Sequence, residues 1–111
     1  GATLVVGHGP HVLRAAEWRD DRLALYSLGN LVTYGPFNVL EPLNRGAVAC
    51  ADLVDRRVVR AELRPTVQRV AGVVRPDSTR RALALIDSLS ALDFPMTGVR
   101  VAPSGELLRR P

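Results

Sequence analysis

The 111-residue chain has no lysine, a single cysteine and only five aromatic residues, one Trp, two Tyr and two Phe. The lone Cys50 excludes an internal disulfide and a thiolate metal cluster within this chain. Its neighbours in "AVACADL" predict a small buried core residue. No apolar run approaches the roughly 20 residues of a membrane-spanning helix. We therefore expect any membrane association to depend on an absent N-terminal part.

The absence of lysine means that arginine supplies all of the formal positive charge, with 15 Arg against 11 acidic residues and a net charge of +4. A basic surface attracts anionic partners. These arginines, however, occur singly or in pairs such as Arg56-Arg57 and Arg80-Arg81, with no aromatic interleaving that would stack bases. We therefore expect no nucleic-acid partner.

Hydrophobic residues make up 47% of the chain, which is enough for a packed core. Short apolar or alternating runs bounded by turn residues predict strands and hairpins. The outer arm of the second predicted hairpin alternates Val59, Ala61 and Leu63 with charged residues, so one face should be buried. Its inner arm is small and apolar, as expected for a strand covered on two sides. The predicted strand segments are residues 4–6, 15–18 with 23–27 around a four-residue loop, 47–53 with 58–64 around a turn at 54–57, an edge segment at 67–74, and 99–102 with 106–108.

The next predictions concern the end of one strand, an irregular loop and the single helix. Pro65 should end the strand that precedes it, because proline cannot donate a ladder hydrogen bond. One helix is expected over residues 79–92, capped by Asp77 or Ser78 and ended by Phe94-Pro95. Residues 34–38 should form an irregular loop. The apolar stripe of the helix is predicted to be Ala82, Leu85, Ile86, Leu89 and Leu92.

These elements predict an α+β fold dominated by strands, with two β-hairpins, one late helix and a small terminal hairpin. The chain opens on Gly-Ala-Thr directly before the apolar run at residues 4–6. We therefore expect residues 1–111 to be the C-terminal portion of a single longer domain. Exposed strand edges should make this portion marginally stable.

Both histidines of the chain, His8 and His11, lie in the glycine-rich stretch "VVGHGPHV" after the first predicted strand. Neutral imidazole binds zinc, manganese or iron through one ring nitrogen. Gly9 permits backbone angles that other residues avoid, and Pro10 fixes φ directly before His11. The stretch therefore predicts a metal-binding loop, although two exposed histidines in a surface turn would show the same spacing.

The longer run from Gly7 to Asn30 resembles the C-terminal signature of the CapA-like capsule or poly-γ-glutamate biosynthesis family. The likeness rests on "GHGPHV", on Glu17 in the following hairpin, and on "YSLGN" at residues 26–30. It runs without gaps for about 24 residues, and a looser likeness continues to the late helix. Many relatives carry histidine where this chain has Gly9, and phenylalanine where it has Leu31. His11 is therefore the position carried over first, and His8 second.

The resemblance implies a calcineurin-like metallophosphoesterase fold, a β-sandwich flanked by helices. It implies two divalent metals, manganese, iron or zinc, completed by upstream loops absent here, so the chain alone should be inactive. Implied partners are an anionic polymer or phosphoester substrate and polymer-synthase subunits. The implied location is the bacterial cell surface or another extracytoplasmic site, with the cytoplasm left open.

The same resemblance gives three residues a supporting role beside the metals. Asn30 would face the site, although Gly-Asn is also an ordinary turn pair. Glu17 would either bond to the histidine loop from within or be a wet hairpin residue. Gly9 would line the site. Trp18 and Tyr26 are expected to pack in the hairpin.

A hypothesis of another class is a non-catalytic accessory subunit that scaffolds a polymer synthase. Upstream loops that carry aspartates and an Asn-His pair would favour the enzyme, and their absence would favour the scaffold.

Overall fold

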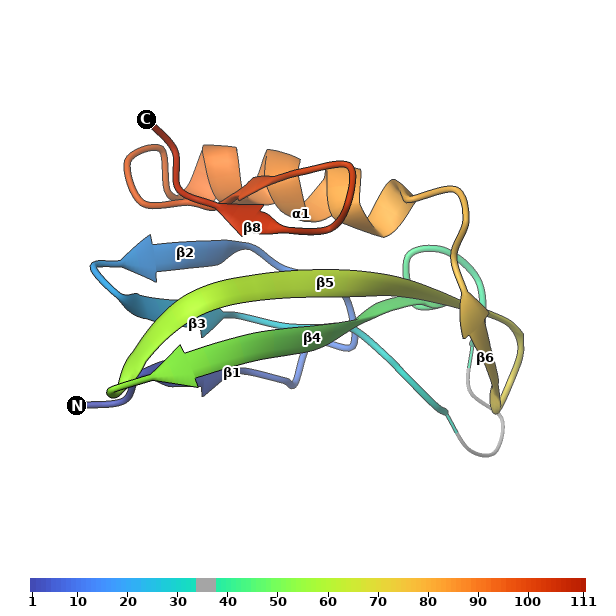
Figure 1. Ribbon diagram of the computed structural model, residues 1–111. Helices are drawn as coiled ribbons and strands as arrows, with labels where there is room; N and C mark the ends of the chain where they lie inside the picture. Colours follow the sequence, from blue (N-terminus) through green and yellow to red (C-terminus); the bar gives the residue numbers. More distant parts are fainter. Residues whose placement is uncertain (34–37) are drawn as a thin grey trace.

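The computed structural model describes residues 1–33 and 38–111. Three sheets, with strand orders β1-β3-β2, β4-β5-β6 and β7-β8, are joined by one helix into a small α+β domain (Figure 1). The prediction of an α+β fold class is therefore confirmed, at the level of strands in small sheets with one helix. The predicted irregular loop at 34–38 lies outside the described residues, except for Asn38. In chain order the elements are β1 (Leu4–Val6), β2 (Ala16–Arg19), β3 (Arg22–Leu25), β4 (Arg45–Val54), β5 (Arg57–Val70), β6 (Val73–Pro76), α1 (Arg81–Asp93), β7 (Arg100–Val101) and β8 (Leu107–Leu108).

Both predicted hairpins form, with loops shorter than expected. Arg19 pairs with Arg22, so two residues rather than four join β2 to β3. Asp55 and Arg56 join β4 to β5 with φ of 48° and 62°. Positive φ at both central positions is typical of the type I′ turn, whose twist suits a tight hairpin. β1 then pairs with β3 in parallel, and no other strand among residues 1–33 and 38–111 pairs with its second edge.

The alternation predicted for β5 holds only in its middle. Ala61 and Leu63 are 3% and 1% exposed, but Val59 is 58% exposed, so its predicted burial is wrong. The β4–β5 register shifts at Asp52–Leu53. Such an irregularity re-aims the residues beside it. Val58, at 3% exposure, occupies the core instead.

The prediction that β4 is covered on both faces is wrong. The strand lies at the edge of its sheet and pairs only with β5 within that sheet. Ala49 and Ala51 pack against the core, whereas Val48 on the opposite face is 37% exposed. Cys50 shares that outer face and is only partly buried, so its predicted core position is also wrong.

Pro65 does not end its strand, because β5 continues through it to Val70. The N–H of Leu63 points away from β4 and donates to the Gly105 carbonyl at 2.8 Å. Alternate residues of a strand face the same edge, so the nitrogen of Pro65 also points away from β4. No ladder bond to β4 is lost, and the Pro65 carbonyl accepts from Asp77 N–H at 2.9 Å.

Helix α1 forms close to the predicted range, but its cap and its buried face differ from the prediction. Arg80 is the N-cap residue, in a left-handed conformation, without a side-chain cap hydrogen bond. Leu85 and Leu92 are 36% and 76% exposed, while Leu83 and Ser90 are buried. The Ser90 hydroxyl accepts from Ala16 N–H at 2.9 Å. This bond holds the face of the helix that carries Ser90 against β2, so the face that carries Leu85 and Leu92 points to solvent.

The core gathers buried side chains from both larger sheets, from α1 and from the terminal hairpin. Figure 1 shows α1 and β8 on one side of the strands, with both chain ends at the same end of the molecule. Within the described ranges no helix is long and apolar enough to cross a membrane. The largest apolar side chains that are almost completely enclosed are Leu23, Leu63, Ile86 and Val99.

Candidate functional site

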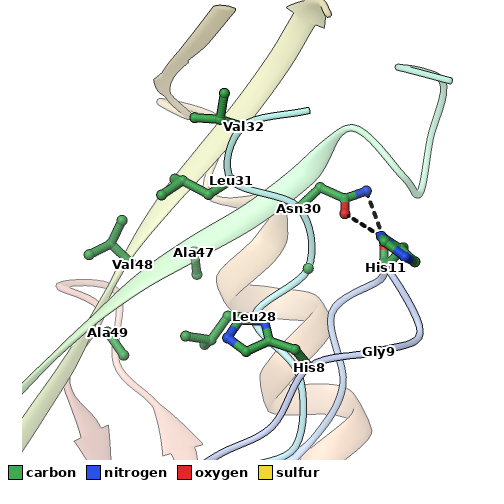
Figure 2. A pocket seen from close by; sticks show the side chains of 11 residues that line it. His8, Gly9, His11, Leu28, Asn30, Leu31, Val32, Ala47, Val48 and Ala49 are labelled. Carbon is green, nitrogen blue, oxygen red and sulfur yellow. Dashed lines mark hydrogen bonds between the residues drawn. The ribbon is translucent and has the colours of Figure 1, made fainter. Parts of the chain in front are cut away.

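The histidine loop opens onto a pocket of about 470 Å³, hereafter the histidine pocket. His8, Gly9, His11 and Asn30 form its polar part (Figure 2). The remaining wall is mainly apolar and comes from two segments, the stretch after β3 and the beginning of β4. That wall consists of Leu28, Gly29, Leu31, Val32, Ala47, Val48 and Ala49.

His11 and Asn30 are joined by two contacts. The Nδ1 atom of His11 lies 2.9 Å from the Oδ1 atom of Asn30, and the Asn30 Nδ2 atom donates to the His11 carbonyl at 3.1 Å. Figure 2 shows both contacts as dashed lines. The two residues are 19 positions apart in the chain, so the contact connects the loop to the strand region that follows the first hairpin.

A third hydrogen bond fixes how the Asn30 amide is turned. Its Nδ2 atom also donates to the Leu43 carbonyl at 2.9 Å. Because both bonds of Nδ2 go to carbonyl oxygens, Nδ2 must be the donor end and Oδ1 the acceptor end. The Nδ1 atom of His11 then carries the proton. In the neutral ring, Nε2 is left as the nitrogen with the lone pair, which is the atom that can ligate a metal.

A close approach of two backbones places Asn30 at this point. A Cβ added to Gly46 would lie 2.2 Å from the Asn30 carbonyl oxygen. Only glycine at the start of β4 permits the segment after β3 to run so close, and the bridge between Gly29 and Gly46 joins the two backbones. Asn30 itself is 8% exposed.

The loop backbone adopts unusual conformations at two positions. Gly9 has φ of 135°, which side-chain-bearing residues rarely adopt. His11 has φ of 60° without being glycine. Left-handed backbone costs a non-glycine residue energy that the surrounding contacts must offset. Here the two bonds to Asn30 supply such contacts, and they hold the imidazole in one orientation.

His8 is held less firmly than His11. It is exposed, and no hydrogen bond of its side chain occurs among residues 1–33 and 38–111. In the view of Figure 2 its ring projects toward Leu28, whereas the ring of His11 projects toward Asn30. The pocket therefore holds one oriented imidazole and one that can turn.

Apart from residues 34–37, which the structure does not describe, no three His, Cys, Asp or Glu residues gather closely enough to hold a metal ion. Two imidazoles are one or two ligands short of the usual zinc coordination. The described residues of the pocket therefore do not form a complete metal site.

Glu17 lies in a different place from the histidine pocket. It is 1% exposed on β2, and its carboxylate accepts hydrogen bonds from the hydroxyls of Tyr26 and Thr97, each at 2.6 Å. The Arg19 Nε atom donates to it at 3.0 Å. We call these four residues the Glu17 cluster. Glu17 is thus neither a wet hairpin residue nor a partner of the histidine loop.

The cluster favours the ionised form of Glu17. Burial opposes the charged form, but hydrogen bonds from Thr97, Tyr26 and Arg19 outweigh it and hold the pKa of the carboxyl below its usual value. The same contact works in the opposite direction on Tyr26, where the hydrogen bond to the Glu17 carboxylate raises the pKa of the phenol. The cluster ties the first hairpin to the segment between α1 and β7.

The two hairpin aromatics pack as expected from the sequence. Trp18 is 7% exposed, and the guanidinium of Arg109 lies 4.6 Å from its ring centre. Tyr26 stacks on Phe94 with ring centroids 5.1 Å apart. Neither aromatic lines the histidine pocket.

Sequence reasoning missed Leu43, whose carbonyl orients Asn30, and Thr97, which completes the Glu17 cluster. Leu43 acts through a backbone oxygen, so its residue type carries no signal. Thr97 is 80 positions from Glu17, and only the fold brings the two together.

Residues 1–34 match the family model described as bacterial capsule synthesis protein PGA_cap. The match spans β1 to β3, the histidine loop and Asn30, and it stops before β4. A search of curated proteins finds no match for the chain. The family match suggests a role in capsule synthesis and supports the CapA-like resemblance over this first part of the chain.

Proposed function

We propose that the chain is part of a metal-dependent hydrolase of bacterial capsule synthesis, with His11 as the first metal ligand and His8 as the second. The observation that carries this proposal is the orientation of Asn30. Its amide leaves His11 with the lone pair on Nε2, and it lies inside the segment that matches the capsule synthesis family.

The residues of the pocket suit a divalent metal in three respects. The imidazole of His11 is oriented before any metal arrives, so less conformational entropy is lost on binding. A side-chain acceptor on the opposite ring nitrogen is the usual partner of a metal-binding histidine and raises the basicity of the ligand. Manganese, iron and zinc all accept imidazole, so the donor set does not choose among them.

Bound divalent metals would supply a hydroxide nucleophile. The residues of this chain would bind and orient. His11 and His8 hold the metal, Asn30 fixes the His11 tautomer, and the apolar wall excludes water from one side. The remaining ligands would come from residues beyond this chain. The substrate is an anionic polymer such as poly-γ-glutamate, or a phosphoester, acted on at the bacterial cell surface.

Metal binding can be measured on the chain without an activity assay. Calorimetric titration with zinc or manganese should show one weak site, and His11→Ala should lower the affinity by at least about tenfold. His8→Ala should lower it less, because its ring is not pre-oriented. Val32→Ala is the matched control, since Val32 lines the same pocket and has no ligand atom.

Equal affinities in wild type, His11→Ala and Val32→Ala would show that His11 binds no metal in this chain by itself. Mass spectrometry of the full-length parent would then distinguish a failed site from an incomplete one. Near-stoichiometric metal that falls in His11→Ala supports the hydrolase.

The second candidate is a non-catalytic scaffold for polymer-synthase subunits. It is favoured by one observation, that residues 1–33 and 38–111 bring no three metal-ligating side chains together. A parent protein without bound metal, which still co-purifies with the synthase, would support this candidate.

A further inference from the structure

The orientation of the Asn30 amide depends on a short turn, residues 41–44, that does not line the histidine pocket. The Leu43 carbonyl of this turn accepts from Asn30 Nδ2 at 2.9 Å. The last residue of the turn is held on β5, because the Asn44 carbonyl accepts from Gln68 N–H at 2.8 Å. The place of the Leu43 carbonyl therefore also depends on what holds the beginning of the turn.

Arg45, the first residue of β4, holds the beginning of this turn. It is 9% exposed, and it is the one arginine that is buried in the part of the chain that the structure describes. Its Nε atom donates to the Glu41 carboxylate at 2.9 Å, and a terminal guanidinium nitrogen donates to the same carboxylate. Glu41 begins the turn and Arg45 directly follows it, so this ion pair joins the two ends of the turn.

The other terminal nitrogen of Arg45 donates to the carboxylate of Asp77, which lies between β6 and α1. The side chain of Asp77 is only 3% exposed, and the Thr79 N–H and hydroxyl donate to it at 3.0 and 2.6 Å. Burial opposes the charged form of Asp77, but the bonds from Thr79 and Arg45 outweigh burial and keep the pKa of the carboxyl below its usual value. One guanidinium therefore ties the turn to a fixed carboxylate next to the helix.

The ion pairs of Arg45 matter more for geometry than for stability. Removing charges from water costs free energy that their mutual attraction has to offset, so a buried ion pair stabilises a fold little. A guanidinium, however, is planar and presents its N–H donors in a fixed fork. Two carboxylates bound to that fork are held at a fixed distance and angle from each other. Here they fix the turn relative to the segment before α1.

We propose that Arg45 is a positioning residue for the histidine pocket, since it holds the Leu43 carbonyl against Asn30 Nδ2. The Oδ1 atom of Asn30 then faces Nδ1 of His11, and the lone pair of the neutral ring stays on Nε2. Neither Arg45 nor its two carboxylate partners line the pocket, so Arg45 acts only through the turn. The inference rests on the proposed function, in which that lone pair binds a metal.

Nitrogen NMR of the metal-free whole chain tests the proposal, at a pH where the His11 ring is neutral. In Arg45→Met the ratio of the two His11 tautomers should move about fivefold toward the form protonated on Nε2, as expected for the loss of one hydrogen bond. The Nδ2 protons of Asn30 should exchange with water faster by about the same factor. The His11 carbonyl still accepts from Asn30 Nδ2, so the amide is not released completely.

Glu41→Ala is the second variant, because Arg45→Met also leaves the buried Asp77 carboxylate without its partner and so reduces stability. The Glu41 side chain is 51% exposed, and its removal leaves the bond between Arg45 and Asp77 in place. The tautomer ratio should move about twofold, as expected for an exposed ion pair. Glu41→Ala therefore decides the test on its own where Arg45→Met fails to fold.

Glu62→Ala is the matched control. Glu62 also accepts from two arginines, Arg60 and Arg64, but it pairs with Cys50 in the middle of β4, away from the turn. This variant loses the same charge and should leave the tautomer ratio unchanged. An equal change in Glu62→Ala would show a general effect of lost charge and overturn the proposal.

An unchanged His11 ratio, with unchanged exchange at Asn30, in folded Arg45→Met and Glu41→Ala would also overturn the positioning role. These measurements need no metal, so they fail separately from the proposed function. A wild type that binds no zinc, together with a shifted ratio in both variants, would contradict metal binding by this chain and still support the role of Arg45.

Discussion

The histidine pocket and the Glu17 cluster both depend on polar side chains from the first 34 residues, yet they are held in opposite ways. Glu17 is 1% exposed, and its carboxylate accepts from three side chains. His8 and His11 lie on an exposed loop beside a 470 Å³ pocket, and one fixed amide orients His11. One group is enclosed by its partners, whereas the other faces a space that a ligand can enter.

Within the first 34 residues, the groups that stabilise the fold are therefore different from the groups that can contact a ligand. A buried carboxylate whose acceptor sites are filled by internal donors stabilises the fold and has little left to offer a substrate. An oriented imidazole at a pocket costs backbone energy at φ of 60° and stabilises little by itself. We therefore assign Glu17 to the fold, whereas the histidines carry the proposed metal-binding function.

The largest expected effect is the loss of stability in Glu17→Ala. Removing the carboxylate leaves the Tyr26 and Thr97 hydroxyls without their acceptor, and we expect the free energy of unfolding to fall by about 3 kcal/mol. Urea denaturation measures this loss. Zinc affinity should stay unchanged in conditions where the variant is folded. A folded variant that loses zinc affinity would erase the separation between the two regions.

Asn30→Ala is expected to reduce stability less than Glu17→Ala does, and to reduce zinc affinity more. Zinc affinity should fall about 10- to 100-fold, because His11 loses the group that fixes its tautomer and ring orientation. Thr33→Val serves as the control, since Thr33 is also buried but bonds to Gln68 outside the pocket. Equal zinc affinities in the two variants would contradict the role given to Asn30.

The free energy of unfolding is expected to change gradually with pH. The pKa of Glu17 in the folded chain lies below its ordinary value of 4.5, so the stability that its carboxylate contributes is present above pH 4.5. That contribution is lost as the pH falls through the folded pKa. Asp77, bonded to Thr79 and Arg45, also has a lowered pKa and acts in the same direction. Unfolding free energies measured between pH 6 and pH 3 should therefore decrease, less steeply in Glu17→Gln than in wild type.

The sequence predicts the hairpin turns and the end of the helix, because residues close together in the chain decide these features. Turn residues mark both hairpins, and Phe94-Pro95 marks the end of α1. Pro65 misled the prediction because its cost depends on which edge of the strand its nitrogen faces. Likewise, the helix stripe failed at Leu92 because a tertiary hydrogen bond from Ala16 to Ser90 sets which face is buried.

For the site, the sequence could predict the residue types and their loop but not their partners. His8, Gly9, His11 and Asn30 do come together around one pocket. Glu17 goes elsewhere, because the strand period turns it toward Tyr26 and Thr97 rather than toward the loop. Only the three-dimensional arrangement brings the Leu43 carbonyl to Asn30, and that contact decides which ring nitrogen of His11 holds the proton.

The most direct test of the account is nitrogen NMR of the histidine rings during a zinc titration of the whole chain. The account predicts that neutral His11 is protonated on Nδ1 before zinc is added, and that its Nε2 resonance shifts when zinc binds. Asn30→Ala should show a mixture of the two tautomers. A proton on Nε2 of His11 in the wild type, or an Nε2 resonance unmoved by zinc, would contradict the central claim.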